Sequence, residues 1–73
     1  MVRQPNTIDK LISYNLKTVR LNSGLSLQKI SERLGVSYQQ IQKYENGKNR
    51  ISAGRLWHLS QIYGVPIEIF FKR

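Results

Sequence analysis

The chain has 73 residues, no cysteine, and 12 basic against four acidic side chains, so that its formal net charge is +8. This length allows one domain, near the lower limit for folding on its own core, and the lack of cysteine excludes a disulfide framework, a thiolate metal site and a cysteine nucleophile. The absence of a transmembrane-length apolar run and of a signal-peptide core predicts a cytoplasmic protein with no membrane partner, while the basic excess favours nucleic acid as the bound polyanion.

The N-terminal third of the chain predicts an arm and a helix. Residues 1–6 are polar and are expected to form a flexible arm, with contact of Arg3 to a DNA backbone as the alternative. Apolar residues then recur at helical spacing over residues 8–22, which predicts a first helix that ends at Ser23 and Gly24. These apolar residues are Ile8, Leu11, Ile12, Leu16 and Val19.

Residues 26–47 predict two short helices joined by a tight turn. Ser26 and Ser37 are suitable N-caps, because a serine side chain accepts a hydrogen bond from the unpaired N–H groups of a first helical turn. Gly35 can adopt the left-handed conformation that ends the first of these helices, and the second is expected to run to about Asn46. A helix, a glycine turn and a second helix form the helix-turn-helix pattern, whose second helix can enter a DNA major groove.

The second of these helices has an outer face suited to reading bases. With Ile41 facing the core, helical geometry predicts which residues occupy the outer face, its flanks and the helix tip. They are Tyr38, Gln39, Gln40, Gln42, Lys43 and Asn46. A glutamine amide matches the edge of adenine, a lysine donates to guanine, and this face carries no acid. The alternative is that glutamine simply forms a solvated helix surface.

The segment after this helix is basic and polar. A Gly-Lys-Asn-Arg run at residues 47–50 can lay Lys48, Arg50 and backbone N–H groups along phosphates, with an ordinary solvated turn as the alternative. Ser52 is expected to cap a fourth helix that Gly64 ends. The inner stripe of this helix is expected to comprise Ala53, Leu56, Leu59 and either Ile62 or Tyr63, with Trp57 partly buried beside it.

A short fifth helix is predicted to begin at Val65 and Pro66, because proline is favoured at the first helical position. Its aromatic residues Phe70 and Phe71 are expected either to complete the core or to remain partly exposed for a two-fold partner. No repeat, low-complexity tract or second domain is evident.

The chemistry-bearing residues do not form a catalytic set. The four acids lie in four different segments, and His58 is the single histidine, which we interpret as structural or surface-exposed. A catalytic site needs a nucleophile or base and a residue that orients it. We therefore expect no catalytic residue, no metal site, no cofactor and no enzyme activity.

The run LGVSYQQIQKYENGKNRISAGRLWHLSQIYGVP resembles the Cro/phage-repressor (XRE-type) helix-turn-helix regulators of bacteria and phages. The resemblance extends over residues 16–71, and its most specific parts are IQKYENGKNRIS and GVP. It implies an all-α, compact, five-helix, lambda-repressor-like DNA-binding domain over residues 1–73, with the helix-turn-helix at helices two and three. It also implies a homodimer bound to double-stranded operator DNA.

The resemblance also implies roles for particular residues. The base-reading positions fall on Tyr38, Gln39 and Lys43, with Gln40 and Gln42 close by. The phosphate-contacting positions fall on Ser37, Asn46, Lys48 and Arg50. A buried ion pair falls on Arg20 and Glu45, which the expected packing of the first helix against the third also favours, with an exposed pair as the alternative. One position departs from the family, because Leu27 stands where a phosphate-contacting glutamine is common.

Two functions of different classes follow from these features. The first is a sequence-specific transcriptional regulator, expected to be a repressor, that reads the major groove with its third helix. The second is an antitoxin or adaptor that uses the same fold to bind a protein partner. The acid-free outer face of the third helix favours the first, since an adaptor has no need of it.

Overall fold

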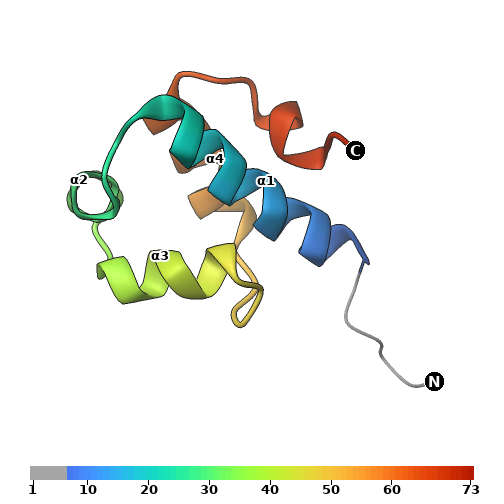
Figure 1. The fold of residues 1–73 in the computed structure, drawn as a ribbon, viewed down its shortest axis with the longest axis horizontal. Helices are drawn as coiled ribbons and strands as arrows, with labels where there is room; N and C mark the ends of the chain where they lie inside the picture. The colour runs from blue at the N-terminus through green and yellow to red at the C-terminus, as the bar shows by residue number, and fades with distance from the viewer. Residues whose placement is uncertain (1–6) are drawn as a thin grey trace.

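The computed structural model describes residues 7–73, and this part of the chain contains four α-helices, one 3-10 helix and no strand (Figure 1). The elements are α1 (Thr7–Ser23), α2 (Leu27–Leu34), α3 (Tyr38–Glu45), α4 (Ala53–Tyr63) and the 3-10 helix η1 (Ile67–Phe71). The all-α prediction is confirmed for these residues, and none of their helices is long and apolar enough to cross a membrane. The expected arm, with Arg3, lies outside the described residues.

The fifth element is a 3-10 helix and not the α-helix that the five-helix prediction requires. Its backbone N–H of Ile69 donates to the carbonyl of Pro66 at 3.0 Å, which is the shorter 3-10 spacing. The side-chain amide of Asn15 in α1 donates to the carbonyls of Phe70 and Lys72, both at 2.8 Å. Hydrogen bonds from α1 therefore hold the C-terminal segment in place.

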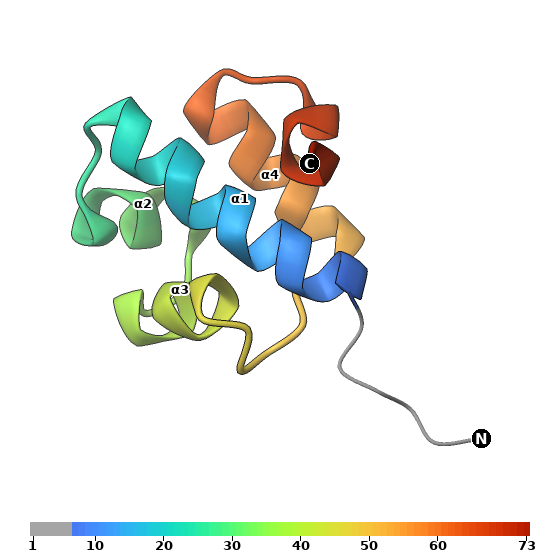
Figure 2. The same cartoon turned by 45° about the vertical axis from the view of Figure 1, so that its right-hand side comes forward.

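The core receives a buried side chain from every element, which makes the short helices depend on one another. Its buried members are Leu16, Ile30, Leu34, Ile41, Tyr44, Leu56, Leu59 and Phe70. Helices of eight residues, such as α2 and α3, are marginal alone in water, so this shared burial is what stabilises them. In Figures 1 and 2, α3 and η1 lie on opposite sides of α1, and α3 forms one edge of the molecule.

The local signals around α2 and α3 behave as expected. The side-chain oxygens of Ser26 and Ser37 accept hydrogen bonds from the backbone N–H groups of Lys29 and Gln40, at 3.1 and 3.2 Å. Gly35 ends α2 in the left-handed conformation, with a φ of 81°. The helix-turn-helix geometry is thus present, and its turn is fixed by hydrogen bonds within the motif.

Two burial expectations are wrong. Trp57 is 56% exposed, because the buried side of α4 is centred on Leu56, Leu59 and Ser60 and leaves Trp57 beyond its edge. Ala53 is also exposed, as the first residue of α4.

The two C-terminal aromatic residues differ in burial. Phe70 is completely buried and closes the core, whereas Phe71 is 45% exposed. The structure therefore leaves one of the two rings available at the surface.

Candidate nucleic-acid interface

The outer face of α3 is exposed and polar, as its sequence predicts. Gln39, Gln42 and Lys43 are exposed, and Tyr38 at the first position of the helix is 48% exposed. Gln40 is half-buried, so it contributes only part of its side chain to the surface. On the inner side, Ile41 and Tyr44 are buried in the core and set the rotation of the helix. The structure thus brings the expected base-reading residues together on one accessible surface.

The end of α3 is shaped by backbone hydrogen bonds. The N–H groups of Lys48 and Asn49 both donate to the carbonyl of Lys43, at 2.9 and 3.2 Å. Gly47 has a φ of 79°, which favours glycine, and a Cβ at this position would lie 3.7 Å from the hydroxyl of Ser13 in α1. The loop that follows α3 therefore turns sharply and passes close to α1.

The expected phosphate-contacting residues flank α3. The hydroxyl oxygen of Ser37 caps the start of the helix, which leaves its O–H available as a donor. The side-chain oxygen of Asn46 accepts from the N–H of Lys48 at 3.2 Å, so its amide N–H groups remain for another partner. Lys48 and Arg50 are exposed on the loop. These donors lie at the two ends of the exposed face.

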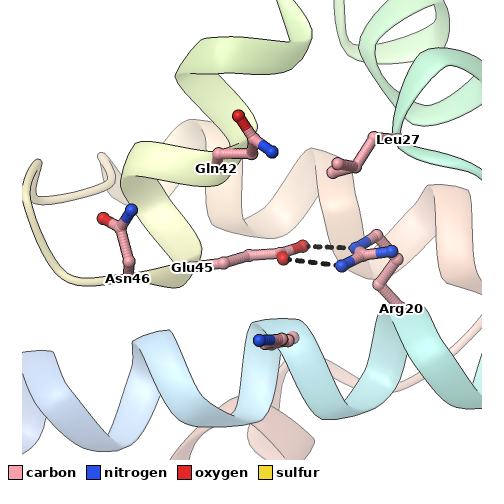
Figure 3. Close-up of a pocket in the computed structure, with 6 residues that line it drawn as sticks. Arg20, Leu27, Gln42, Glu45 and Asn46 are labelled. Atoms are coloured by element: carbon pink, nitrogen blue, oxygen red, sulfur yellow. Dashed lines mark hydrogen bonds and ion pairs between the residues drawn. The ribbon is translucent and has the colours of Figure 1, made fainter.

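Arg20 and Glu45 form a bidentate pair between α1 and the last residue of α3 (Figure 3). Nε of Arg20 donates to Oε2 of Glu45 at 2.7 Å, and Nη2 donates to Oε1 at 3.0 Å. Their side chains are only 14% and 7% exposed. The hydrogen bond to Glu45 raises the pKa of Arg20 above its usual value, against the opposing effect of burial. Arg20 therefore stays charged, and the pair holds the C-terminal end of α3 against α1.

Tyr63 of α4 responds to the same pair. Burial raises the pKa of the Tyr63 phenol above its usual 10.0, the charge of Glu45 raises it further, and Arg20 opposes this effect. The phenol is thus kept neutral.

A solvent-open pocket of about 310 Å³ lies at the same junction. Its lining residues come from α1, α2, α3 and the α3 cap, and they are Lys17, Arg20, Leu27, Gln42, Glu45 and Asn46. Figure 3 shows the amides of Gln42 and Asn46 on the α3 side and Leu27 opposite them. Leu27 is half-buried against the core and offers no polar atom, so this wall of the pocket is apolar.

Two contacts of this region are not indicated by the sequence. The carboxylate of Asp9 in α1 lies 3.0 Å from Nε of Arg50 on the loop. Arg55 of α4 donates from Nη1 to the buried hydroxyl of Tyr44 at 2.7 Å. Asp9 has a sufficient local role in the first turn of a helix, where a negative charge suits the helix dipole, so nothing in its sequence context indicates a distant partner.

Comparison with known proteins identifies the helix-turn-helix as the part of the chain that is shared with a family. A family model described as helix-turn-helix matches residues 16–70. An uncharacterized HTH-type transcriptional regulator of Sinorhizobium medicae is 44% identical over 70 residues, which cover 96% of this chain and 50% of that protein. An uncharacterized transcriptional regulator in the ATPase CF(0) region of Rhodospirillum rubrum is 42% identical over 64 residues, covering 88% of this chain and 59% of that protein.

An uncharacterized HTH-type transcriptional regulator of Rickettsia prowazekii is 42% identical over 65 residues, which cover 89% of this chain and 50% of that protein. The chain thus spans about half the length of the curated relatives that it matches.

Proposed function

Because the chain belongs to the XRE-type helix-turn-helix family, we propose that it is a sequence-specific DNA-binding transcriptional regulator, and specifically a repressor, that reads the major groove with α3. The observation that carries this proposal is the exposed outer face of α3, where amide and ammonium groups stand together without an acid. Such side chains form the specific hydrogen bonds to adenine and guanine edges.

The electrostatics of the region support the proposal. Glu45 is the one acidic residue of α3, and its carboxylate is bound to Arg20 and turned inward. Asp9, the acid beside the loop, faces Arg50. Both of these carboxylates are therefore matched by an arginine. The remaining basic excess of the chain, +8 overall, is available to attract phosphate.

We further propose that two copies bind one operator. A helix of eight residues reaches few base pairs, and a second copy one helical turn away, ~34 Å along the duplex, would double the contacts. Phe71, at 45% exposed, is a candidate for a two-fold contact between the copies. Native mass spectrometry with the operator duplex should detect two protomers per site, and a stable one-to-one complex would contradict the dimer.

Selection of bound fragments from a random duplex pool tests the function. The wild-type protein should enrich a two-fold symmetric sequence. Gln39→Ala and Lys43→Ala should each relax the preference at one base position per half-site, by about 1–3 kcal/mol. Gln61→Ala, which removes an exposed glutamine from α4, is the matched control and should enrich the wild-type sequence. If both α3 variants keep the wild-type preference, α3 is not the reading helix.

Salt dependence tests the phosphate contacts separately. Log K should fall with log salt at a slope of about −0.9 for each phosphate neutralised. Lys48→Ala should weaken all sequences alike and reduce this slope by about one unit for each phosphate that the variant no longer neutralises. Binding that is insensitive to salt would rule out the phosphate contacts.

A further inference from the structure

The ion pair between Asp9 and Arg50 connects the first turn of α1 to the loop that follows α3. Oδ2 of Asp9 lies 3.0 Å from Nε of Arg50. The Asp9 side chain is 31% exposed and the Arg50 side chain is 67% exposed, so the carboxylate is the more enclosed partner. The guanidinium consequently projects from this carboxylate toward solvent, on the loop beside the proposed DNA-reading helix.

The atom through which Arg50 makes this contact is informative. A guanidinium presents five N–H donors in a rigid plane, one on Nε and four on the two terminal nitrogens. Contact at Nε orients the plane and leaves the terminal nitrogens farther from the backbone, where an outside anion can meet them. The two terminal nitrogens together can bind a phosphate in a bidentate manner.

The backbones that carry the two side chains are themselves held together. The loop turns at Gly47, whose position lies against Ser13, one turn beyond Asp9 in α1. The N–H groups of Lys48 and Asn49 are bonded to the last turn of α3. The loop up to Asn49 is therefore held against α3 and α1, and the ion pair with Asp9 restrains the guanidinium of the next residue, Arg50.

We propose that Asp9 is a positioning residue that holds the Arg50 guanidinium ready for a backbone phosphate of DNA, an inference that rests on the proposed function. A free arginine side chain loses rotamer freedom when it binds. The carboxylate restricts that freedom in the unbound protein, so less is lost on binding DNA. Although Asp9 carries a charge that repels DNA, it strengthens binding through Arg50.

This proposal and simple charge repulsion predict opposite signs for one substitution. Asp9→Asn removes a negative charge, and long-range electrostatics alone would make the variant bind DNA more tightly. Positioning predicts the reverse, about two- to fivefold weaker binding, the range for an exposed ion pair. Fluorescence anisotropy with the labelled operator duplex at fixed salt measures the difference. Asp9→Glu keeps a carboxylate and should retain more affinity than Asp9→Asn.

Glu68→Gln is the matched control. Glu68 is also an exposed acid in the first turn of its element, but η1 lies on the opposite side of α1 from α3 (Figure 2). This variant has the same change in net charge and should bind operator DNA as tightly as wild type or more tightly. A weakening confined to Asp9→Asn therefore supports positioning.

Repeating the substitution in an Arg50→Ala background separates the possible failures. There Asp9→Asn should no longer weaken binding. If Arg50→Ala weakens binding but Asp9→Asn in the wild-type background does not, the inference is wrong and the proposed function stands. If Asp9→Asn weakens binding equally in both backgrounds, Asp9 acts through the fold and the inference is again wrong. If Arg50→Ala has no effect, both the phosphate contact of Arg50 and the inference fail.

Discussion

Two arginine–carboxylate pairs connect α1 with α3 and the loop that follows it, and the two pairs differ in solvent exposure. The side chains of Arg20 and Glu45 are 14% and 7% exposed and meet through two hydrogen bonds. Those of Arg50 and Asp9 are 67% and 31% exposed. In the buried pair α1 supplies the cation, and in the exposed pair it supplies the anion. The exposed arrangement leaves an arginine on the loop side, where a proposed phosphate would lie.

Burial decides whether an ion pair of this kind contributes to folding or remains free to adjust when a ligand binds. Removing one partner of a buried pair leaves an uncompensated charge in the interior, so the pair is coupled to folding. An exposed pair exchanges its partner for water at little cost, so it can adjust when a ligand arrives. We therefore assign Arg20 and Glu45 to the placement of α3, whereas the proposal for Asp9 and Arg50 concerns binding.

The largest expected effect comes from breaking the buried pair. Arg20→Met or Glu45→Gln alone should lower the free energy of unfolding by ~3–5 kcal/mol, because each leaves the other partner buried without its bond. The double variant should recover much of this loss. Urea unfolding of the four proteins gives the coupling free energy. Simple additivity would mean that the two side chains are not coupled in solution.

The pKa of Tyr63, which lies near the buried pair, predicts a pH dependence of the free energy of unfolding. Its pKa is raised in the folded protein above the ordinary 10.0, so the unfolded state loses this proton first as pH rises. The free energy of unfolding should therefore fall above about pH 10, by at most ~1.4 kcal/mol per pH unit and by less where solvent screens the phenol. Urea unfolding at several pH values should show a shallower fall for Tyr63→Phe. Equal slopes for the two proteins would contradict the raised pKa.

A hydrogen bond between α4 and α3 should contribute less to the free energy of unfolding than the buried ion pair. Tyr44→Phe removes the hydroxyl that accepts the 2.7 Å hydrogen bond from Arg55 and should cost ~1 kcal/mol of unfolding free energy. Arg55 is exposed and can be solvated instead, so no buried charge results. Tyr14→Phe is the control, because Tyr14 is 69% exposed, and should change stability by less than ~0.5 kcal/mol. Equal losses would show that the bond to Arg55 contributes nothing.

The smallest effect on stability is expected at the exposed pair. Asp9→Asn should lower the free energy of unfolding by no more than ~1 kcal/mol, and this loss should vanish in about 1 M salt, where the Debye length is ~3 Å. The loss caused by Glu45→Gln should persist at the same salt concentration. A comparison of urea midpoints at low and high salt measures both, and a salt-resistant effect of Asp9→Asn would remove the distinction between the pairs.

Much of the helix-turn-helix follows from local sequence. The caps at Ser26, Ser37 and Ser52 each accept an N–H three residues ahead, so a short window of sequence contains both partners. The same holds for Gly35 and Gly64, which end their helices in the left-handed conformation. The outer face of α3 follows from helical periodicity once Ile41 is assigned to the core.

The features that the sequence did not predict depend on contacts between residues far apart in the chain. Asn15 lies within a helix whose pattern has no need of it, yet its amide bonds to Phe70 and Lys72 and anchors η1. Trp57 is apolar enough for a core position and is nevertheless exposed, since the packing of α4 centres on Leu56, Leu59 and Ser60. The roles of particular α3 residues on DNA stay predictions.

The sequence by itself determined the caps, the approximate ends of the four α-helices and the composition of the exposed face of α3, because these depend on hydrogen bonds and periodicity within one or two helical turns. Only the tertiary structure decided that Asp9 faces Arg50, that Asn15 bonds to the C-terminal segment, and that the last element is a 3-10 helix. Such features depend on where helices cross, and a crossing brings together side chains whose separation along the chain carries no signal of their contact.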